Sequence, residues 1–211
     1  MKINCDKSKF ILFNPTENFD FIPEYEIDGK SITTEEEIKI LGLTLRNDLK
    51  WRSNTNNMIQ KAYSRLWIIK RLKQAGANLE DMTDVYIKQI RSVVEFGAPV
   101  WNSGLTKEEI YDIERIQKSF LHIVLGSDYD NYENALKLSK LETLQSRRIT
   151  LCRRFATKAA KHPKHQHWFQ LADPNAPNTR SEKLKYKLPL CRLSRFQKSP
   201  ISYLTSLLNT N

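Results

Sequence analysis

The sequence predicts an α+β fold, in which a small antiparallel β region precedes a bundle of helices and a basic helical tail. Apolar residues recur with a period of two before about residue 50, and with a period near 3.6 from Asn54 on. The composition of the 211 residues, 40% apolar and 27% charged, is typical of a globular chain rather than a disordered one.

The β region is expected to hold three or four short strands. An apolar run at 10–13 is soon followed by proline, which cannot continue a sheet ladder because it lacks the N–H donor. Between 25 and 32, two short runs flank Asp28-Gly29, a pair that tolerates the positive φ angles of a two-residue hairpin turn. Apolar residues alternate again over 38–45, which predicts one further strand.

The helical bundle is expected to contain three long helices with recognisable ends. The first starts near Asn54, and its apolar face is formed by Met58, Ile59, Ala62, Leu66 and Ile69. Asn78 is a candidate N-cap for the second helix, which should end near Gly97. Thr106 begins a capping box for the third, and Gly126 should end it.

The basic tail is expected to hold a fourth long helix, a turn-rich linker and a short final helix. The tetrapeptide Ser139–Glu142 matches a capping box, which predicts a helix from there to about His162. Residues 173–178 are rich in turn formers. Ser199-Pro200 places a cap and a proline at the start of a helix over 201–208.

The positive charge lies downstream of the β region. The formal net charge is +10, of which residues 1–50 contribute −3 and residues 51–211 contribute +13. From Gln145 on, 14 Lys and Arg stand against Asp173 and Glu182 only. Such a surface is expected where a protein meets phosphates, because each neutralised phosphate releases counterions. A solvated basic surface without a partner is the alternative.

The sequence argues against membrane-spanning, secreted and metal-stabilised classes. No apolar run approaches about 18 residues, and the polar first residues are unlike a secretory signal. The three cysteines, Cys5, Cys152 and Cys191, lie too far apart for a disulfide framework or a structural zinc site. The histidines in 162–167 lack a nearby cysteine or carboxylate, so an exposed loop is favoured over a metal site. We expect no membrane partner and an intracellular location, in nucleus or cytoplasm.

Short motifs occur in a fixed order along nearly the whole chain. Lys7-Ser8 precedes the first apolar run, and Leu41-Gly42 lies in the later one. These two motifs resemble motif D and motif E, the primer grip, at the end of the palm of non-LTR (LINE-like, jockey/CR1-type) retrotransposon reverse transcriptases. The thumb and post-thumb region of the same family is similar to the stretches 49–51, 66–72, 95–101 and 113–118 and the helix around Arg147-Arg148. The resemblance implies an end of palm at 1–50, a thumb-like bundle at 51–130 and a basic post-thumb region at 131–211.

The resemblance implies a nucleic-acid-binding C-terminal fragment of an RNA-directed DNA polymerase. Its partners would be RNA, an RNA–DNA hybrid or a primer–template duplex, together with the missing palm and fingers. Reverse transcriptases hold divalent ions on an Asp-Asp pair, and no such pair occurs in this sequence. We therefore expect no polymerisation by this chain alone, no cofactor bound by it, and Mg²⁺ only in a complete polymerase. A decayed or domesticated helical interaction module without a catalytic role is the alternative.

The first candidate site residues follow from these motifs. Lys7 matches a motif D lysine that would protonate the leaving group, with a solvated turn lysine as the alternative. Leu41 and Gly42 match the primer grip, with a glycine needed for strand curvature as the alternative. Lys61 and Arg65 would contact primer–template phosphates, or else belong to an ordinary amphipathic surface.

A second basic set lies on the fourth long helix: Arg147, Arg148, Arg153, Arg154 and Lys158. Guanidinium groups this close repel one another unless an anion meets them, so all are expected outside the core, bound to RNA or DNA backbone or to an acidic protein surface. Aromatic rings can also stack on bases, although we expect most of the four tryptophans, Trp51, Trp67, Trp101 and Trp168, in the core.

Overall fold

The computed structural model describes residues 4, 7–13, 25–173 and 184–210, and its fold is α+β as predicted. Contacts divide the chain into two units, Met1–Asn57 and Met58–Asn211. The boundary falls inside helix α1 (Arg52–Gln74). Cys5 and the linker residues 174–178 lie outside the described residues.

The described residues of the first unit include two antiparallel hairpins. Strand β1 (Tyr25–Ile27) pairs with β2 (Lys30–Ile32), and β3 (Glu37–Ile40) pairs with β4 (Leu43–Arg46). The predicted turn at Asp28-Gly29 is confirmed, because the two residues have φ angles of +51° and +73°.

The second hairpin corrects the sequence prediction of one strand over 38–45. The chain reverses at Leu41 and Gly42, whose φ angles are +48° and +89°. The strand expected at 10–13 is also wrong. Among the described residues, Phe10 makes an isolated bridge to Thr34 and residues 11–13 belong to no strand, so the ladder that a strand requires does not extend along this run.

Polar side chains at the start of α1 fix the neighbouring strand. The Thr44 N–H donates to Asn54 Oδ1 at 3.1 Å, and Asn57 Nδ2 donates to Thr44 Oγ1 at 3.3 Å. Asn54 and Thr44 are both buried. Hydrogen bonds therefore satisfy these polar groups where water does not reach them.

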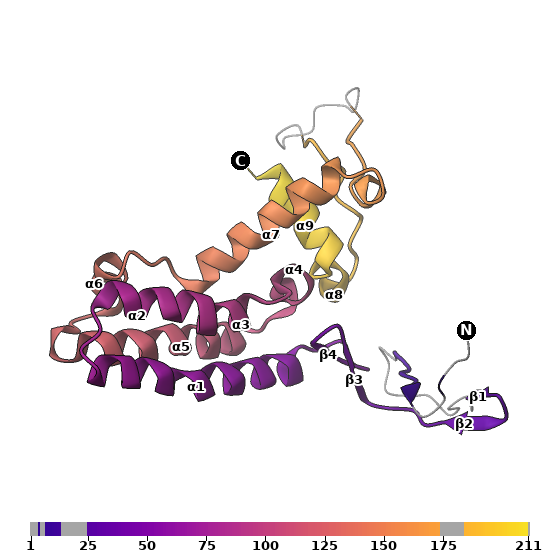
Figure 1. Ribbon diagram of the computed structural model, residues 1–211. Helices are drawn as coiled ribbons and strands as arrows, with labels where there is room; N and C mark the ends of the chain where they lie inside the picture. Colours follow the sequence, from indigo (N-terminus) through magenta and orange to yellow (C-terminus); the bar gives the residue numbers. More distant parts are fainter. Residues whose placement is uncertain (1–3, 5–6, 14–24, 174–183, 211) are drawn as a thin grey trace. The chain divides into compact units, whose positions relative to one another are not determined.

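Three helical segments run alongside one another in the second unit (Figure 1). They are α1 from Met58 on, the segment 79–95, and α5 (Lys107–Leu125). Each buries one apolar stripe, formed by Met58, Ala62, Leu66 and Ile69, by Met82, Tyr86, Ile90 and Val94, and by Ile113, Ile116, Phe120 and Val124. Tyr86 stacks on Phe120 with ring centroids 4.1 Å apart.

Most of the predicted helix ends in this bundle are confirmed. The Asn78 side chain accepts from the Asp81 N–H at 2.8 Å. Thr106 and Glu109 form the reciprocal capping box that starts α5. Gly126 follows α5 with a φ of +60°.

The segment 79–95 is less regular than its sequence predicts. Helix α2 (Leu79–Val85) passes into a π-helix, η2 (Tyr86–Arg91), before α3 (Ser92–Glu95). Gly97, at a φ of +66°, then precedes α4 (Ala98–Trp101). The extra residue per turn of a π-helix rotates the following apolar positions, which period counting does not detect.

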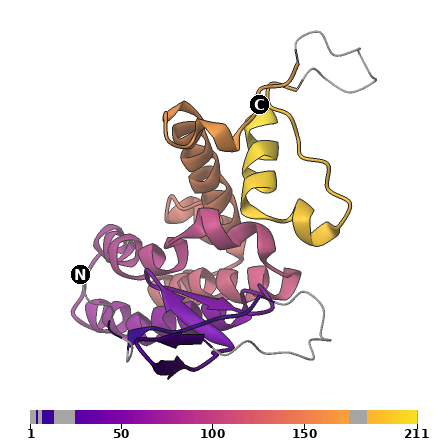
Figure 2. The ribbon, with the colours of Figure 1, turned by 90° about the vertical axis from the view of Figure 1, so that its right-hand side faces the viewer.

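The C-terminal part packs its own apolar cluster. Helix α7 (Leu144–Lys161) lies beside α9 (Pro200–Asn209), with α8 (Ser194–Gln197) leading into α9 (Figures 1 and 2). The buried members of the cluster are Cys152, Ala156, Ala159, Phe169 and Leu204. Proline at the first position of α9 is confirmed.

The capping box predicted at Ser139–Glu142 is wrong. Ser139 instead ends an additional helix, α6 (Tyr132–Leu138), and its hydroxyl donates to Ala135 O at 2.8 Å. The cap of α7 is Thr143, which accepts from the Ser146 N–H at 3.1 Å. The Ser-x-x-Glu pattern failed because the serine is satisfied by the helix that precedes it.

A buried glutamine joins α5 to the segments on either side. Gln117 accepts from the Tyr86 hydroxyl at 2.9 Å, and its amide donates to Tyr132 Oη at 3.0 Å and to Glu142 O at 2.9 Å. Glu114, one turn earlier, accepts from the Tyr132 hydroxyl and from the first N–H of α7, that of Leu144, at 3.0 Å. The start of α7 is therefore held by a carboxylate from α5.

We expect the free energy of unfolding to fall as the pH rises above about 9. Burial raises the pKa of the Cys152 thiol to about 11 from its ordinary 9.0, and raises the pKa of the Tyr86 hydroxyl well above its ordinary 10.0. The unfolded chain therefore releases these protons first. The stability that the neutral buried groups provide is complete below the unfolded pKa and is lost as the pH rises through the folded one.

Urea unfolding between about pH 7 and pH 11 measures this slope. The Cys152→Ala variant should show a shallower decline, because one of the shifted groups is gone. A parent protein whose unfolding free energy is flat or rises over this range would contradict the expectation.

Candidate nucleic-acid interface

The outer face of α1 follows directly from its buried stripe. With Met58, Ala62, Leu66 and Ile69 inside, the opposite side of the helix is exposed and carries Gln60, Ser64, Trp67 and Arg71. The Trp67 side chain is 61% exposed, Trp51 and Trp168 are half-buried, and Trp101 is fully buried. The expectation that most of the four tryptophans lie in the core is therefore wrong. Helix α1 contains six Lys and Arg and no Asp or Glu.

The two α1 residues predicted from the sequence differ in their surroundings. Lys61 is exposed. Arg65 is half-buried, and its Nη1 donates to the carbonyl oxygen of Gln89 in η2. Arg65 therefore connects α1 to the π-helix as well as contributing positive charge. Lys70 and Arg71, both exposed, extend the basic face one to two turns further.

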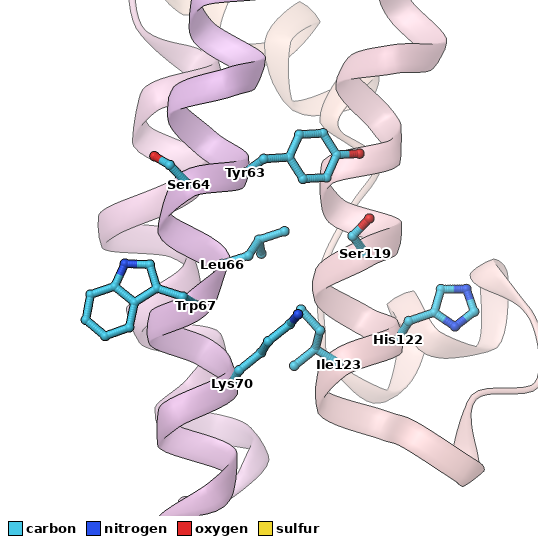
Figure 3. A pocket seen from close by; sticks show the side chains of 8 residues that line it. All are labelled: Tyr63, Ser64, Leu66, Trp67, Lys70, Ser119, His122 and Ile123. Carbon is cyan, nitrogen blue, oxygen red and sulfur yellow. The ribbon is translucent and has the colours of Figure 1, made fainter.

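A groove of about 610 Å³ separates this part of α1 from α5 (Figure 3). Tyr63, Leu66 and Lys70 point from α1 toward α5, while Trp67 and Ser64 lie at the outer side of α1. Lining from α5 comes from Ser119, His122 and Ile123. These residues include two aromatic rings from α1 and no carboxylate.

The end of the groove is fixed by Lys73. Its Nζ donates to Ile123 O at 2.6 Å, in the last turn of α5. A helix C-terminus attracts cations because its last carbonyls lack intrahelical partners. A Cβ on Gly126 would approach the same Nζ to 2.9 Å, so glycine leaves room for this lysine.

Arg148 corrects the prediction for the basic set on α7. Its side chain is fully buried, and Nε donates to Asn102 Oδ1 at 3.0 Å. Asn102 in turn donates to the Tyr203 hydroxyl of α9 at 3.1 Å. Nη1 and Nη2 have no hydrogen-bond partner among the described residues. Burial lowers the pKa of this guanidinium.

The sequence contained a signal for this burial. The steps of four from Leu144 to Arg148, Cys152 and Ala156 place the arginine on the stripe that α7 buries. The sequence prediction used charge repulsion between neighbouring arginines, which favours an exposed position. The position of Arg148 on the apolar stripe instead places its side chain in the core.

Arg147 is also committed to protein contacts. Its Nε lies 3.1 Å from Glu95 Oε1, its Nη1 lies 3.9 Å from Glu142 Oε1, and the side chain is only 24% exposed. Arg91 pairs with the same Glu95 at 3.3 Å. Arg147 therefore connects α7 to α3 and is not a free cation.

The remaining cations of α7 are exposed but do not form one patch. Arg154 and Lys158 lie one turn apart, and Lys161 continues the same face. Arg153 is exposed about 100° further round the helix from Arg154. The usable α7 surface is therefore a row of three cations with Arg153 beside it.

The palm-like candidates lie in the first unit. Lys7 is exposed, and its backbone N–H donates to Asn4 O at 3.2 Å. Leu41 and Gly42 form the turn between β3 and β4, with Leu41 91% exposed. The strand placement implied by the primer-grip comparison is thus replaced by a hairpin tip.

The histidine run forms stacked rings rather than a chelating group. His162 stacks on His165 at 4.9 Å, and His165 lies 4.6 Å from Trp168 between ring centroids. Within the described ranges, no three His, Cys, Asp or Glu side chains gather as a metal site. The helices of the described part also include none long and apolar enough to cross a membrane.

No protein-family model, no curated protein and no solved structure matches this chain.

Proposed function

We propose that this chain binds nucleic acid, as the C-terminal and non-polymerising part of a reverse transcriptase of the non-LTR retrotransposon type. The partner would be RNA, an RNA–DNA hybrid or a primer–template duplex. The observation that carries the binding is the outer face of α1, where Arg71 is exposed one turn from Trp67 and the exposed Lys61 and Lys70 lie on its two flanks. The family assignment rests on the order of the sequence motifs.

The charges on α1 differ from exposed lysines elsewhere in the second unit. Lys88 of η2 pairs with Asp84 of α2 at 2.9 Å, and Lys137 pairs with Glu133 within α6 at 3.1 Å, each four residues apart in the sequence. Helix α1 has no Asp or Glu to form such pairs. Its exposed cations Lys61, Lys70 and Arg71 therefore have no carboxylate partner within the helix, and their field can act on an anion outside it.

The row Arg154, Lys158 and Lys161 on α7 supports the same function. Helix α7 also contains six Lys and Arg and no Asp or Glu. Contacts from such rows to phosphates position a nucleic acid without reading its sequence. We therefore assign little sequence preference to this protein.

Nucleotide transfer is not assigned to this chain. Two-metal chemistry needs a cluster of carboxylates, and the described residues offer no such group for Mg²⁺. Lys7, Leu41 and Gly42 would act only beside a palm and fingers that supply those carboxylates.

The test is a binding titration with labelled single-stranded RNA and an RNA–DNA hybrid between about 50 mM and 200 mM salt. The parent should lose affinity steeply as salt rises. Two charge-removing variants should bind every sequence more weakly, and the log–log salt slope should fall by about one unit per lost phosphate contact. They are K61Q/K70Q/R71Q on α1 and R154Q/K158Q/K161Q on α7.

The matched control removes three exposed lysines from other helices: K88Q/K107Q/K137Q. It lowers the net charge equally and should keep most of the parent's affinity. A parent whose binding does not respond to salt would favour the helical interaction module instead. Equal losses in all three variants would show that net charge alone, and not these faces, governs binding.

A further inference from the structure

We propose that the groove between α1 and α5 is a binding site for an unpaired nucleobase, with Trp67 at its rim as the stacking surface for the same strand. This inference rests on the proposed nucleic-acid function and specifies the form of nucleic acid that the α1 face takes. It concerns a single strand, whereas phosphate contacts alone would serve a duplex equally well.

The first support is the exposure of two aromatic rings. Tyr63 is 37% exposed and Trp67 61% exposed, and they lie one turn apart on α1. Rings of this kind bury large apolar areas in cores and interfaces. Tyr63 points into the groove and Trp67 lies at the outer side of α1, so one exposed ring lines the groove and the other stands at its rim, as on a surface that meets a partner. Bases present a π face to such rings whatever their identity.

The second support is the character of the groove itself. Its volume of about 610 Å³ lies within the range of small-ligand sites. Leu66 and Ile123 give it an apolar wall, and Ser119 adds a hydroxyl that can meet the edge of a base. Apolar walls with a few polar groups are the usual lining of such sites.

Charge selects a polyanion over other occupants. Lys70 extends across the groove from α1, and Arg71 lies one turn beyond Trp67. The absence of any carboxylate from the lining residues leaves this positive field unopposed. A base in the groove would therefore bring its flanking phosphates close to two exposed cations.

The groove is also held in shape before any ligand arrives. Lys73 joins α1 to the last turn of α5, and Arg65 joins α1 to η2. A site whose walls are already fixed loses less conformational entropy on binding. In a duplex the ring faces of the bases are stacked on one another, so this arrangement favours an unpaired strand.

The experiment compares a short oligothymidylate with an abasic strand of the same length and charge. The full chain should bind the base-bearing strand about fivefold or more tightly, because stacking contributes about 1–3 kcal/mol per base. Trp67→Ala should remove this preference while leaving the salt slope unchanged. Trp67→Phe should restore most of it, because it keeps an aromatic face.

Tyr111→Ala is the matched control, since Tyr111 is 58% exposed on α5 but does not line the groove. It should keep the preference of the parent. The inference is overturned if the parent binds both strands equally, if Trp67→Ala keeps the preference, or if polyglutamate competes as well as the oligonucleotide. If both strands bind equally and the binding depends on salt, the nucleobase site is wrong but the proposed nucleic-acid function is supported. If both bind independently of salt, the proposed function is contradicted too.

Discussion

Replacing Arg148 by Ala is expected to lower the free energy of unfolding by about 3–5 kcal/mol, as the loss of a large buried side chain does elsewhere. The change leaves a cavity at a fully buried position of α7 and removes the donor to Asn102. Arg153→Ala, at an exposed position of the same helix, should change stability by less than about 0.5 kcal/mol. Urea unfolding measures both.

Arg148→Met separates packing from charge. Methionine keeps much of the volume but needs no hydrogen bonds, and two guanidinium nitrogens have no partner among the described residues. We expect it to lie within about 1 kcal/mol of the parent, since buried ions are often replaced by apolar residues without loss. A methionine variant as unstable as the alanine variant would show that the charge itself is stabilising.

Replacing Gln117 by Leu is expected to lower the free energy of unfolding by about 3 kcal/mol or more, because it leaves several buried polar groups unpaired. The Tyr86 hydroxyl and the carbonyl of Glu142 both lose their partner. Gln145→Leu, at an exposed position of α7, is the control and should be nearly neutral.

A double-mutant cycle tests the cause. Tyr86→Phe removes the hydroxyl that Gln117→Leu would leave unpaired, so the double variant should be more stable than the sum of the two single losses implies. Strict additivity would mean that the loss comes from packing of the leucine and not from the hydrogen bond.

The sequence predicted correctly those helix caps and turns that depend on a few neighbouring residues. The Asn78 cap, the Thr106 capping box and the Asp28-Gly29 turn each need only a few neighbouring residues, and each is present. Ser139 shows the limit of such patterns. Its hydroxyl could cap the helix that follows it, but it donates to Ala135 O of the helix that precedes it. Leu41-Gly42 shows a second limit. The alternation changes phase between Ile40 and Leu43, and the prediction of one strand did not take this change into account.

The candidate site depended more on tertiary context. Two of the α7 arginines are bound by residues distant in sequence. Arg147 pairs with Glu95, and Arg148 reaches Tyr203 of α9 through Asn102. The aromatic groove requires α1 and α5 together, whereas the apolar stripe of α1 alone already places Trp67 on the opposite side of that helix. Charge counting located the basic helices, but only their neighbours show which cations can meet a ligand.

The pairing of α7 with α9 has a consequence during synthesis. Leu204 and Tyr203 complete the apolar cluster around Cys152 and Ala156, yet they are translated about 40 residues after α7 ends. At ribosomal rates of about 5–20 residues per second, α7 spends roughly 2–8 seconds outside the exit tunnel with its apolar face uncovered. During this interval the nascent helix is open to chaperones and to neighbouring chains, until the arrival of α9 closes it.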